Sequence, residues 1–176
     1  MPFSLKFGGV MMKILVVSDT HRETENLRNV VSRNRYGLDL VIHLGDNEDD
    51  GIIVMKDFPE IAFLSVLGNC DYHSFSSKAK YEGTFKAEGR KIFYTHGHKY
   101  SVKSTTSSIV SNAKLQGCDI VLFGHSHVAY SEMRQDGVLV LNPGSLSMPR
   151  DGSDGTYAIL EINENNVKYI IKGVTE

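Results

Sequence analysis

The sequence contains no run of Lys or Arg residues, only two cysteines and no apolar stretch longer than a strand. A net charge of −2 without a basic cluster excludes the charge pattern of proteins that bind nucleic acids or anionic membranes, so we predict neither partner. Cys70 and Cys118 lie far apart and outside any cysteine-rich motif, which predicts reduced thiols rather than a disulfide framework or a thiolate zinc site. With no signal-peptide pattern and no membrane-length segment, the sequence predicts a cytoplasmic protein.

The length and composition favour one globular domain. The chain has 176 residues, of which 41% are hydrophobic, and this is enough for one sizeable core but short for two domains. A strong strand pattern begins at Met12. We therefore predict a single domain over residues 12–176 and interpret residues 1–11 as an extension without a role in function.

The order of the expected strands and helices predicts an α/β fold. Continuous aliphatic and β-branched runs are typical of strands buried on both faces, and apolar residues three and four positions apart are typical of helices. We predict strands at 12–18, 38–45, 61–69 and 118–127, helices within 23–37, 49–60 and 102–117, and hairpins at 83–98, 128–145 and 155–173. The last third of the chain is thus all β. Two sheets packed face to face, with the helices outside, would use all of these elements.

Residues of the types that bind metal ions follow five of the expected strands. In an open α/β sheet the carboxyl ends of the strands carry the functional groups. A histidine or aspartate at one strand end is commonly structural, as a hydrogen-bonded residue or a turn former. Five such ends favour a functional site, because clustering so many ionisable groups is costly without a cation. The five ends are Ser18–His21, Gly45–Asn47, Gly68–Asp71, Thr95–His98 and Gly124–His127.

The spacing and chemistry of these residues predict a site for two metal ions. Residues i and i+2 of an extended segment point to the same side, so Asp19 with His21, and His125 with His127, would each direct two ligands into one pocket. Carboxylate, carboxamide and imidazole donors suit Mn²⁺, Fe, Co²⁺, Ni²⁺ or Zn²⁺. The donors are too many for one ion and divide between two ions about 3.5–4 Å apart if one carboxylate bridges them. The further donors are Asp46, Asn69 and His96.

The motifs "SDTH", "GD", "GNCD", "THGH" and "GHSH", in this order, resemble those of the calcineurin-like metallophosphoesterases, specifically the small bacterial and archaeal phosphodiesterases of the YfcE type. The resemblance runs from Met12 to about Lys172 and includes "LNPGS" at 141–145. It implies a four-layer α-β-β-α sandwich of two mixed β-sheets flanked by helices, with a dinuclear metal site at the carboxyl ends of the strands. The implied activity is metal-dependent hydrolysis of small phosphodiesters, with a hydroxide that bridges the ions as the nucleophile.

The resemblance also implies roles for individual residues. The implied metal ligands are Asp19, His21 and His127 for one ion, Asn69, His96 and His125 for the other, and Asp46 as the bridge. The implied cofactors are two divalent transition-metal ions, with Mn favoured and Ni, Fe, Co or Zn as alternatives. The implied catalytic residues are Asn69 and His98, and the implied substrate contacts are Asn69, His98 and Cys70. For His98, packing beside the ligands is an equally good interpretation.

Cys70 stands where many larger relatives have a histidine that helps to protonate the leaving group, although the small YfcE-like proteins also have a cysteine there. A thiol is a poor general acid at neutral pH, so we expect a preference for phosphodiesters with good leaving groups and weak phosphomonoesterase activity. We expect His73 to be a loop histidine, with proton donation as the alternative. His43 lies inside the second strand and is expected to have a structural role or to support the ligands.

Small residues at the strand ends are expected to serve the site indirectly. Gly45, Gly68, Gly97 and Gly124 would allow the backbone to turn sharply and to approach the ions. Residues 142–145 would lie near the site and support it, or form an ordinary turn.

The main alternative is a non-catalytic scaffold that binds metal and partner proteins, because the retromer subunit Vps29 shares this fold and resembles these enzymes. The complete ligand set, including His96, favours an enzyme. A nuclease of the same superfamily is disfavoured, because the chain has neither spare length nor a basic excess. The sequence leaves the substrate and the metal open, and the edge of the β-rich tail offers a surface for a homodimer.

Overall fold

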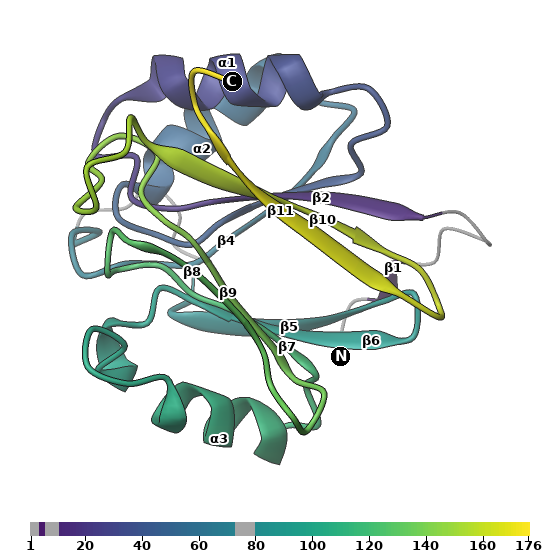
Figure 1. The fold of residues 1–176 in the computed structure, drawn as a ribbon. Helices are drawn as coiled ribbons and strands as arrows, with labels where there is room; N and C mark the ends of the chain where they lie inside the picture. The colour runs from purple at the N-terminus through teal and green to yellow at the C-terminus, as the bar shows by residue number, and fades with distance from the viewer. Residues whose placement is uncertain (1–3, 6–10, 73–79) are drawn as a thin grey trace.

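The structure is a computed structural model that describes residues 4–5, 11–72 and 80–176. Two β-sheets pack face to face, and helices cover their outer faces (Figure 1). The first sheet has the strand order β11-β10-β2-β3-β4. Its strands are β2 (Met12–Val17), β3 (Leu40–His43), β4 (Ala62–Ser65), β10 (Thr156–Ile162) and β11 (Val167–Gly173). The helices on its outer side are α1 (Thr24–Asn34) and α2 (Glu48–Val54), and the 3₁₀ turn η1 (Met55–Asp57) continues α2.

The second sheet has the strand order β1-β5-β6-β7-β9-β8. Its strands are β1 (Ser4–Leu5), β5 (Glu82–Ala87), β6 (Arg90–Thr95), β7 (Ile120–Leu122), β8 (Ala129–Met133) and β9 (Leu139–Pro143). The helix α3 (Ser107–Leu115) covers its outer face, and a short 3₁₀ turn, η2 (His98–Tyr100), follows β6. Both sheets contain parallel and antiparallel pairs, so each is mixed.

The alternation of side chains along β2 explains why both of its faces are apolar. Ile14 and Val16 belong to the core between the two sheets, whereas Leu15 and Val17 pack beneath α1 and α2. Successive strand residues point to opposite faces, so a strand between a sheet and a helix layer is hydrophobic on both faces, and in β2 only Lys13, near its start, is not apolar. The helices contribute the faces that their spacing predicts, namely Leu27, Val30 and Val31 from α1 and Ile109, Val110 and Ala113 from α3.

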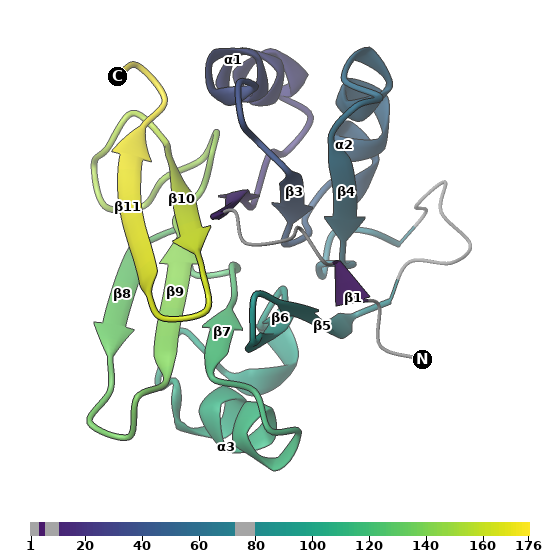
Figure 2. The ribbon, with the colours of Figure 1, turned by 90° about the vertical axis from the view of Figure 1, so that its right-hand side faces the viewer.

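Parallel pairing brings the carboxyl ends of the central strands to the same side of the molecule. β2, β3 and β4 run parallel in the first sheet, and β6, β7 and β9 run parallel in the second. Figure 2 shows the two sets of strands stacked one above the other. The loops that follow β2, β3, β4, β6 and β7 carry the predicted ligands.

The predicted fold class is confirmed: two mixed sheets lie between outer helices, in the order expected. The three expected hairpins are also present, since β5 pairs with β6, β8 with β9 and β10 with β11. The predicted strand at 118–127 is too long, because β7 ends at Leu122 and the chain then leaves the sheet for a loop. The predicted extension over residues 1–11 falls largely outside the described residues and stays a prediction, although Ser4–Leu5 pair with Lys86–Ala87 of β5.

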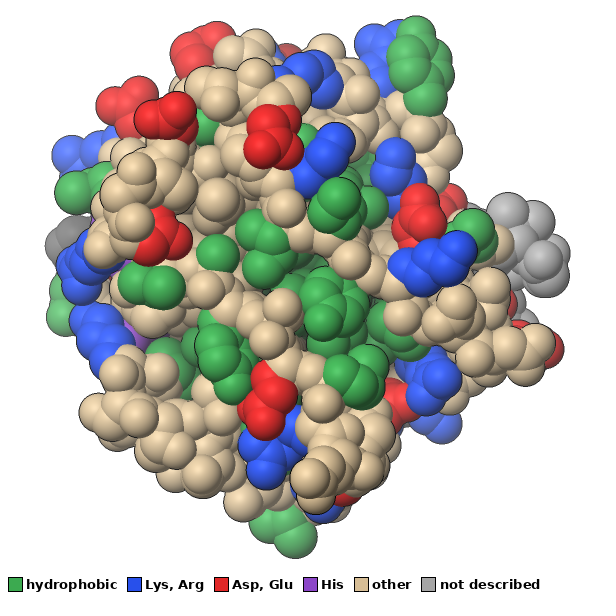
Figure 3. Space-filling view, in the orientation of Figure 1, with side chains coloured by type: hydrophobic (Ala, Val, Ile, Leu, Met, Phe, Trp, Pro, Cys, Tyr) green, Lys and Arg blue, Asp and Glu red, His purple; other side chains and the backbone are tan. Residues whose placement is uncertain are grey.

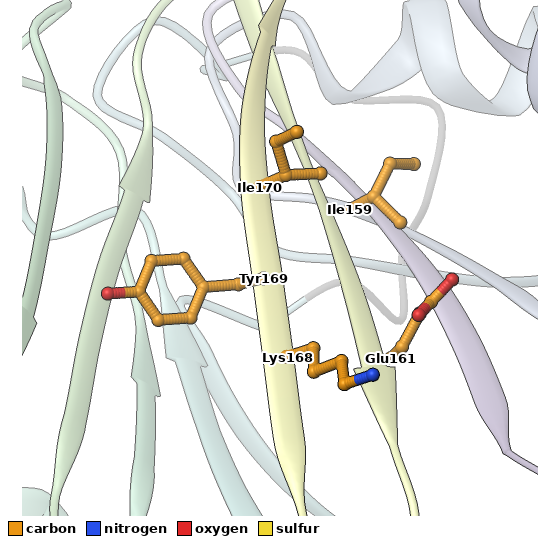
Figure 4. A pocket seen from close by; sticks show the side chains of 5 residues that line it. All are labelled: Ile159, Glu161, Lys168, Tyr169 and Ile170. Carbon is orange, nitrogen blue, oxygen red and sulfur yellow. The ribbon is translucent and has the colours of Figure 1, made fainter.

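The helices cover the outer side of β11 only in part, since Ile170 is 52% exposed, and Figure 3 shows apolar side chains near the middle of the face that it views. A shallow cavity of about 200 Å³ is lined by residues of the hairpin of β10 and β11. In Figure 4 Ile159, Ile170, Lys168 and Glu161 lie on this side, whereas Tyr169 points toward the other sheet. No helix in the described part of the chain is long and apolar enough to cross a membrane.

Candidate metal centre

The loops at the carboxyl ends of the strands bring all of the predicted ligands together in two adjoining groups. Four residues form the first group, and their potential ligand atoms all lie within 4.8 Å of one another: Asp19, His21, Asp46 and His127. Within it His127 Nε2 lies 3.1 Å from Asp19 Oδ1 and 3.4 Å from His21 Nε2. His21 Nε2 lies 3.9 Å from Asp46 Oδ2. The side chains of His21, Asp46 and His127 thus converge with that of Asp19 on one point.

The second group surrounds His96. Its Nε2 atom lies 3.4 Å from Asp46 Oδ1, 3.2 Å from Asn69 Oδ1 and 3.2 Å from His125 Nδ1. Asp46 therefore directs one carboxylate oxygen toward each group. The side chain is buried, so little water competes for either oxygen. This is the arrangement expected of a bridging carboxylate.

The prediction that the two ligand pairs lie on extended segments is wrong. The two pairs were expected on extended segments, but all four residues lie in loops in the left-handed region. The φ angles are +56° at Asp19, +46° at His21, +68° at His125 and +60° at His127. Residues other than glycine adopt this region only when the surrounding structure holds them there. As a result His125 faces the second group and His127 the first, rather than both facing one point.

Backbone carbonyl groups orient two of the imidazoles. His96 donates from Nδ1 to the carbonyl oxygen of Leu44 at 2.7 Å, and His127 donates from Nδ1 to the carbonyl oxygen of Met148 at 2.6 Å. Because a carbonyl can only accept, the proton of each ring is on Nδ1 and Nε2 is directed into the site. Histidines that bind metal ions are commonly held in this way.

An orphaned carboxylate oxygen provides a test of whether metal ions fit these residues. Asp19 Oδ1 is buried and has no hydrogen-bond partner, although Oδ2 accepts from Ser18 Oγ at 2.6 Å and from the His125 N–H at 3.2 Å. Oδ1 faces His127 Nε2, which is also an acceptor when Nδ1 carries the only proton. Two buried acceptors at this distance are unfavourable unless a proton or a metal ion lies between them. The donor set therefore fits divalent metal ions.

The electrostatics of the site keep the carboxylates ionised. Burial acts to raise the pKa of Asp19, but the neighbouring His127 and His96 lower it below its ordinary value. Asp46 behaves in the same way, since His96 and the Cys70 N–H overcome the effect of burial and lower its pKa. In the absence of ions, Asp19 raises the pKa of His127, so protons on the imidazoles balance the carboxylate charge. Metal binding replaces such protons.

His125 is electrostatically different from the other ligands. Burial, followed by the positive charges of His96 and Lys103, lowers its pKa to about 4. The imidazole is therefore neutral at neutral pH, which is the form that binds a metal ion.

A buried hydrogen-bond chain that sequence reasoning did not assign connects the loops after β2 and β3. The Gly45 N–H donates to His43 Nδ1 at 3.1 Å, so His43 carries its proton on Nε2 and donates to Thr20 Oγ1, also at 3.1 Å. Thr20 in turn donates to Asp50 Oδ2 at 2.7 Å. Burial lowers the pKa of His43, which keeps the ring neutral, as this chain requires. His43 thus has a structural role that supports the ligand loops.

Asp71 is a second residue whose role was missed. Its carboxylate accepts from the backbone N–H groups of Asp46 at 3.0 Å, Glu48 at 2.9 Å and Gly68 at 2.7 Å. It therefore holds the loop after β3 against the loop after β4. The last letter of the "GNCD" motif was the available signal, but nothing in a sequence shows which distant N–H groups a carboxylate binds.

We expect Asp71→Ala to lower the affinity for Mn²⁺ by about 10- to 100-fold, the usual cost of losing a group that orients metal ligands. The three N–H groups would lose their acceptor, and the loop that carries Asp46 would become less well fixed. Calorimetric titration of chelator-stripped protein with Mn²⁺ measures the change. The matched control is Asp154→Ala, which removes an exposed carboxylate. Equal affinity of the two variants would contradict this role for Asp71.

The remaining predicted site residues lie at the edge of the two groups. The His98 ring lies 5.4 Å from that of His96 and 5.7 Å from that of Tyr81, and burial lowers its pKa. Cys70 is exposed, its Sγ accepts from Asn69 Nδ2 at 3.4 Å, and burial with the charge of Asp46 raises its pKa to about 11. His73 lies outside the described residues.

The late loop supports the site, as expected. Ser145 Oγ donates to the carbonyl oxygen of Asp19 at 2.9 Å, and Asn142 Nδ2 donates to the carbonyl oxygen of Gly124 at 3.0 Å and to Ser126 Oγ at 2.9 Å. The loop thus fixes the backbone on both sides of the first group of ligands.

Comparison with known sequences points to one family. Residues 12–165 match the calcineurin-like phosphoesterase superfamily domain. The probable metallophosphoesterase YsnB of Bacillus subtilis is 37% identical over 155 residues, which cover 88% of this chain and 86% of that protein. Phosphodiesterase YfcE of Escherichia coli is 26% identical over 173 residues, which cover 86% of this chain and 88% of that protein.

Comparison with solved structures agrees. A predicted phosphoesterase from Streptococcus pneumoniae superposes with a TM-score of 0.79 at 26% identity, over 96% of this chain and 93% of that one. Vacuolar protein sorting 29 from Cryptosporidium parvum superposes with a TM-score of 0.73 at 17% identity, over 93% of this chain and 99% of that one. The second likeness shows the fold alone. The resemblance inferred from the motifs is confirmed.

Proposed function

The chain belongs to the calcineurin-like phosphoesterase superfamily and is a metal-dependent phosphoesterase, and from this premise we propose that it hydrolyses small phosphodiesters with two metal ions. The observation that carries the proposal is the position of Asp46. One buried carboxylate directs Oδ1 toward His96 and Oδ2 toward His21, so a single side chain contributes to both groups of donors. A site for one ion does not need this arrangement.

One set of residues would bind the metal ions, and a second, overlapping set would bind the substrate. Asp19, His21 and His127 would hold one ion, Asn69, His96 and His125 the other, and Asp46 both. When bound, such ions lower the pKa of a coordinated water and stabilise negative charge on the phosphoryl group. The nitrogen and oxygen donors suit Mn²⁺, which we propose as the native ion, with Ni, Fe, Co or Zn as alternatives.

Asn69 and His98 are the groups of this chain that we propose to contact the substrate. Asn69 directs Oδ1 toward His96, which leaves its Nδ2 donor with only a weak bond to the Cys70 thiol. That donor is available for a phosphoryl oxygen. His98 is kept neutral by burial and by the charges of His96 and Lys99, so it would bind a phosphoryl oxygen as an N–H donor rather than as a cation.

We expect Cys70→Ala to retain its metal ions and to change kcat/KM for bis-p-nitrophenyl phosphate by less than about threefold. A thiol with a pKa near 11 is a poor proton donor, and p-nitrophenolate leaves without protonation. Alanine also keeps the backbone N–H that Cys70 donates to Asp46 Oδ1 at 2.9 Å. The readout is steady-state kinetics with bound metal quantified. A hundredfold loss at full metal content would mean that the thiol takes part in the reaction.

The proposed function is tested with chelator-stripped protein. Hydrolysis of bis-p-nitrophenyl phosphate is measured without metal and after addition of Mn²⁺, Ni²⁺, Co²⁺ or Zn²⁺, alongside p-nitrophenyl phosphate as the monoester. We expect activity to appear at about two ions per chain and to favour the diester. Two tightly bound ions without turnover of either ester would instead support a non-catalytic scaffold that binds partner proteins.

We further propose a cytoplasmic location, which the two unpaired cysteines support, since reduced thiols are typical of that compartment. The homodimer stays a prediction.

A further inference from the structure

A cavity of about 570 Å³ lies against the loop after β7, which also carries His125 and His127. Ser126, one of its lining residues, lies between the ligands His125 and His127 in the chain. Residues 102–106, which follow η2, also line it. The lining residues that matter here are Val102, Lys103, Thr106, Phe123, Ser126 and Tyr130. A group attached to a phosphate at the metal centre could therefore extend into this cavity.

The base of the cavity is apolar and aromatic. Phe123 and Val102 are almost fully buried, and their positions are fixed by packing against β7 and α3. The Tyr130 ring lies 6.2 Å from that of Phe123 and is 38% exposed. Its hydroxyl donates to Glu132 Oε2 at 2.8 Å, which fixes the ring at the edge of the cavity. Exposed aromatic surface of this kind binds flat apolar groups well.

The rim of the cavity is polar and positively charged. Lys103 is exposed and forms no ion pair with any residue that the structure describes. The hydroxyl groups of Ser104, Thr105 and Thr106 line the same rim. A monoanionic phosphodiester between the metal centre and this rim would be attracted by Lys103.

We propose that this cavity binds one of the two alcohol groups of the phosphodiester substrate, and that this group is a nucleoside. The inference rests on the proposed function and specifies its substrate class. The volume is that of a small-molecule pocket, Tyr130 offers a surface on which a base stacks, and the hydroxyl groups and Lys103 offer hydrogen bonds to a sugar and a phosphate. An alkyl alcohol would form no hydrogen bond with these hydroxyl groups.

The experiment compares two phosphodiesters that share one leaving group. Thymidine 5′-(p-nitrophenyl phosphate) carries a nucleoside as the retained alcohol, whereas methyl p-nitrophenyl phosphate carries a methyl group. The metal-loaded protein should hydrolyse the thymidine ester with at least a tenfold higher kcat/KM. Equal kcat/KM values for the two esters would overturn the nucleoside assignment and leave the phosphodiesterase intact. Hydrolysis of neither ester would overturn the proposed function, and the inference with it.

Variants of cavity residues then test whether the preference for the thymidine ester arises in the cavity. Tyr130→Ala should lower kcat/KM for the thymidine ester by about tenfold, the effect of losing a stacking contact, and leave the methyl ester unchanged. Tyr130→Leu is the second variant at that position, because leucine keeps packing volume on β8 but removes the aromatic face. Tyr36→Ala removes an aromatic side chain that is 80% exposed elsewhere and should change neither ester. Equal losses on both esters would contradict a role in specificity.

A binding measurement that needs neither metal nor turnover completes the test. Thymidine is titrated into chelator-stripped protein, and backbone amide signals are followed by NMR. We expect shifts of the signals of residues 102–106 and 126–130, and a reduced response in Tyr130→Ala. Shifts confined to other regions, or none at millimolar thymidine, would contradict the assignment.

Discussion

Replacing Asp46 with asparagine is expected to lower kcat/KM for bis-p-nitrophenyl phosphate by about 10³-fold or more, because metal ions supply several kcal/mol and each 1.36 kcal/mol is tenfold in rate. Both carboxylate oxygens face imidazoles, one in each group of donors. An amide would offer one oxygen and turn an NH₂ group toward the other group of ligands, where it would repel a cation. The loss should therefore affect both ions, not one.

The measurement is metal content after desalting, by mass spectrometry, together with steady-state kinetics. Asp136→Asn is the matched control, because Asp136 lies in an exposed turn and pairs with Lys114 on the surface. Exposed pairs of this kind contribute little. We expect the control to keep both ions and full activity. If Asp46→Asn also kept two ions and full turnover, Asp46 would not be the shared ligand.

Replacing Gly45 with alanine is expected to lower the free energy of unfolding by roughly 3–5 kcal/mol, the sum of overpacking and of a left-handed backbone. The residue has φ of +93°, and an added Cβ atom would lie 2.5 Å from Gly68 N and 2.9 Å from Gly68 Cα. These are backbone atoms of the adjacent ligand loop, so no side chain can rotate to make room. Because Asp46 and Asn69 flank the two contacts, activity should fall as well.

Gly89→Ala separates the cost of the left-handed backbone from the cost of the contact with Gly68. Gly89 has a similar φ of +79° in the hairpin between β5 and β6, but a Cβ atom there would meet nothing within 4 Å. We expect this control to lose only about 1–2 kcal/mol, the cost of the left-handed backbone for alanine. Chemical unfolding of both variants, fitted with a common m-value, gives the difference. A similar loss in the two variants would mean that contact with Gly68 has no effect on stability.

Much of the fold and of the ligand set could be predicted from local sequence patterns. Residues 12–17 are apolar at every position except Lys13, which marked a strand buried on both faces, and the apolar spacing of Leu27, Val30 and Val31 marked the face of α1. The ligand set could be recognised because Asp, Asn and His follow glycines at the ends of several strands. The metal ions themselves, and the division of the ligands between them, stay proposals.

Other features of the site depend on contacts between distant segments. Asp50 and Asp49 are adjacent residues of the same type, yet it is Asp50 that accepts the hydrogen bond that completes the chain from His43 through Thr20. Asp71 likewise matters because of three N–H groups, two of which are more than 20 positions away. No periodicity encodes such partners.

The sequence by itself determined the layers of this protein and the strand ends at which its ligands lie, because hydrophobic periodicity reports which faces are buried and parallel strands end at the same side. Only the tertiary structure decided the backbone conformation that presents these ligands. The loops after β2 and β7 hold Asp19, His21, His125 and His127 at positive φ, a conformation that these residues do not favour alone. Contacts from other loops, such as the bond from Ser145 to the Asp19 carbonyl, impose it, and those contacts exist only in the folded chain.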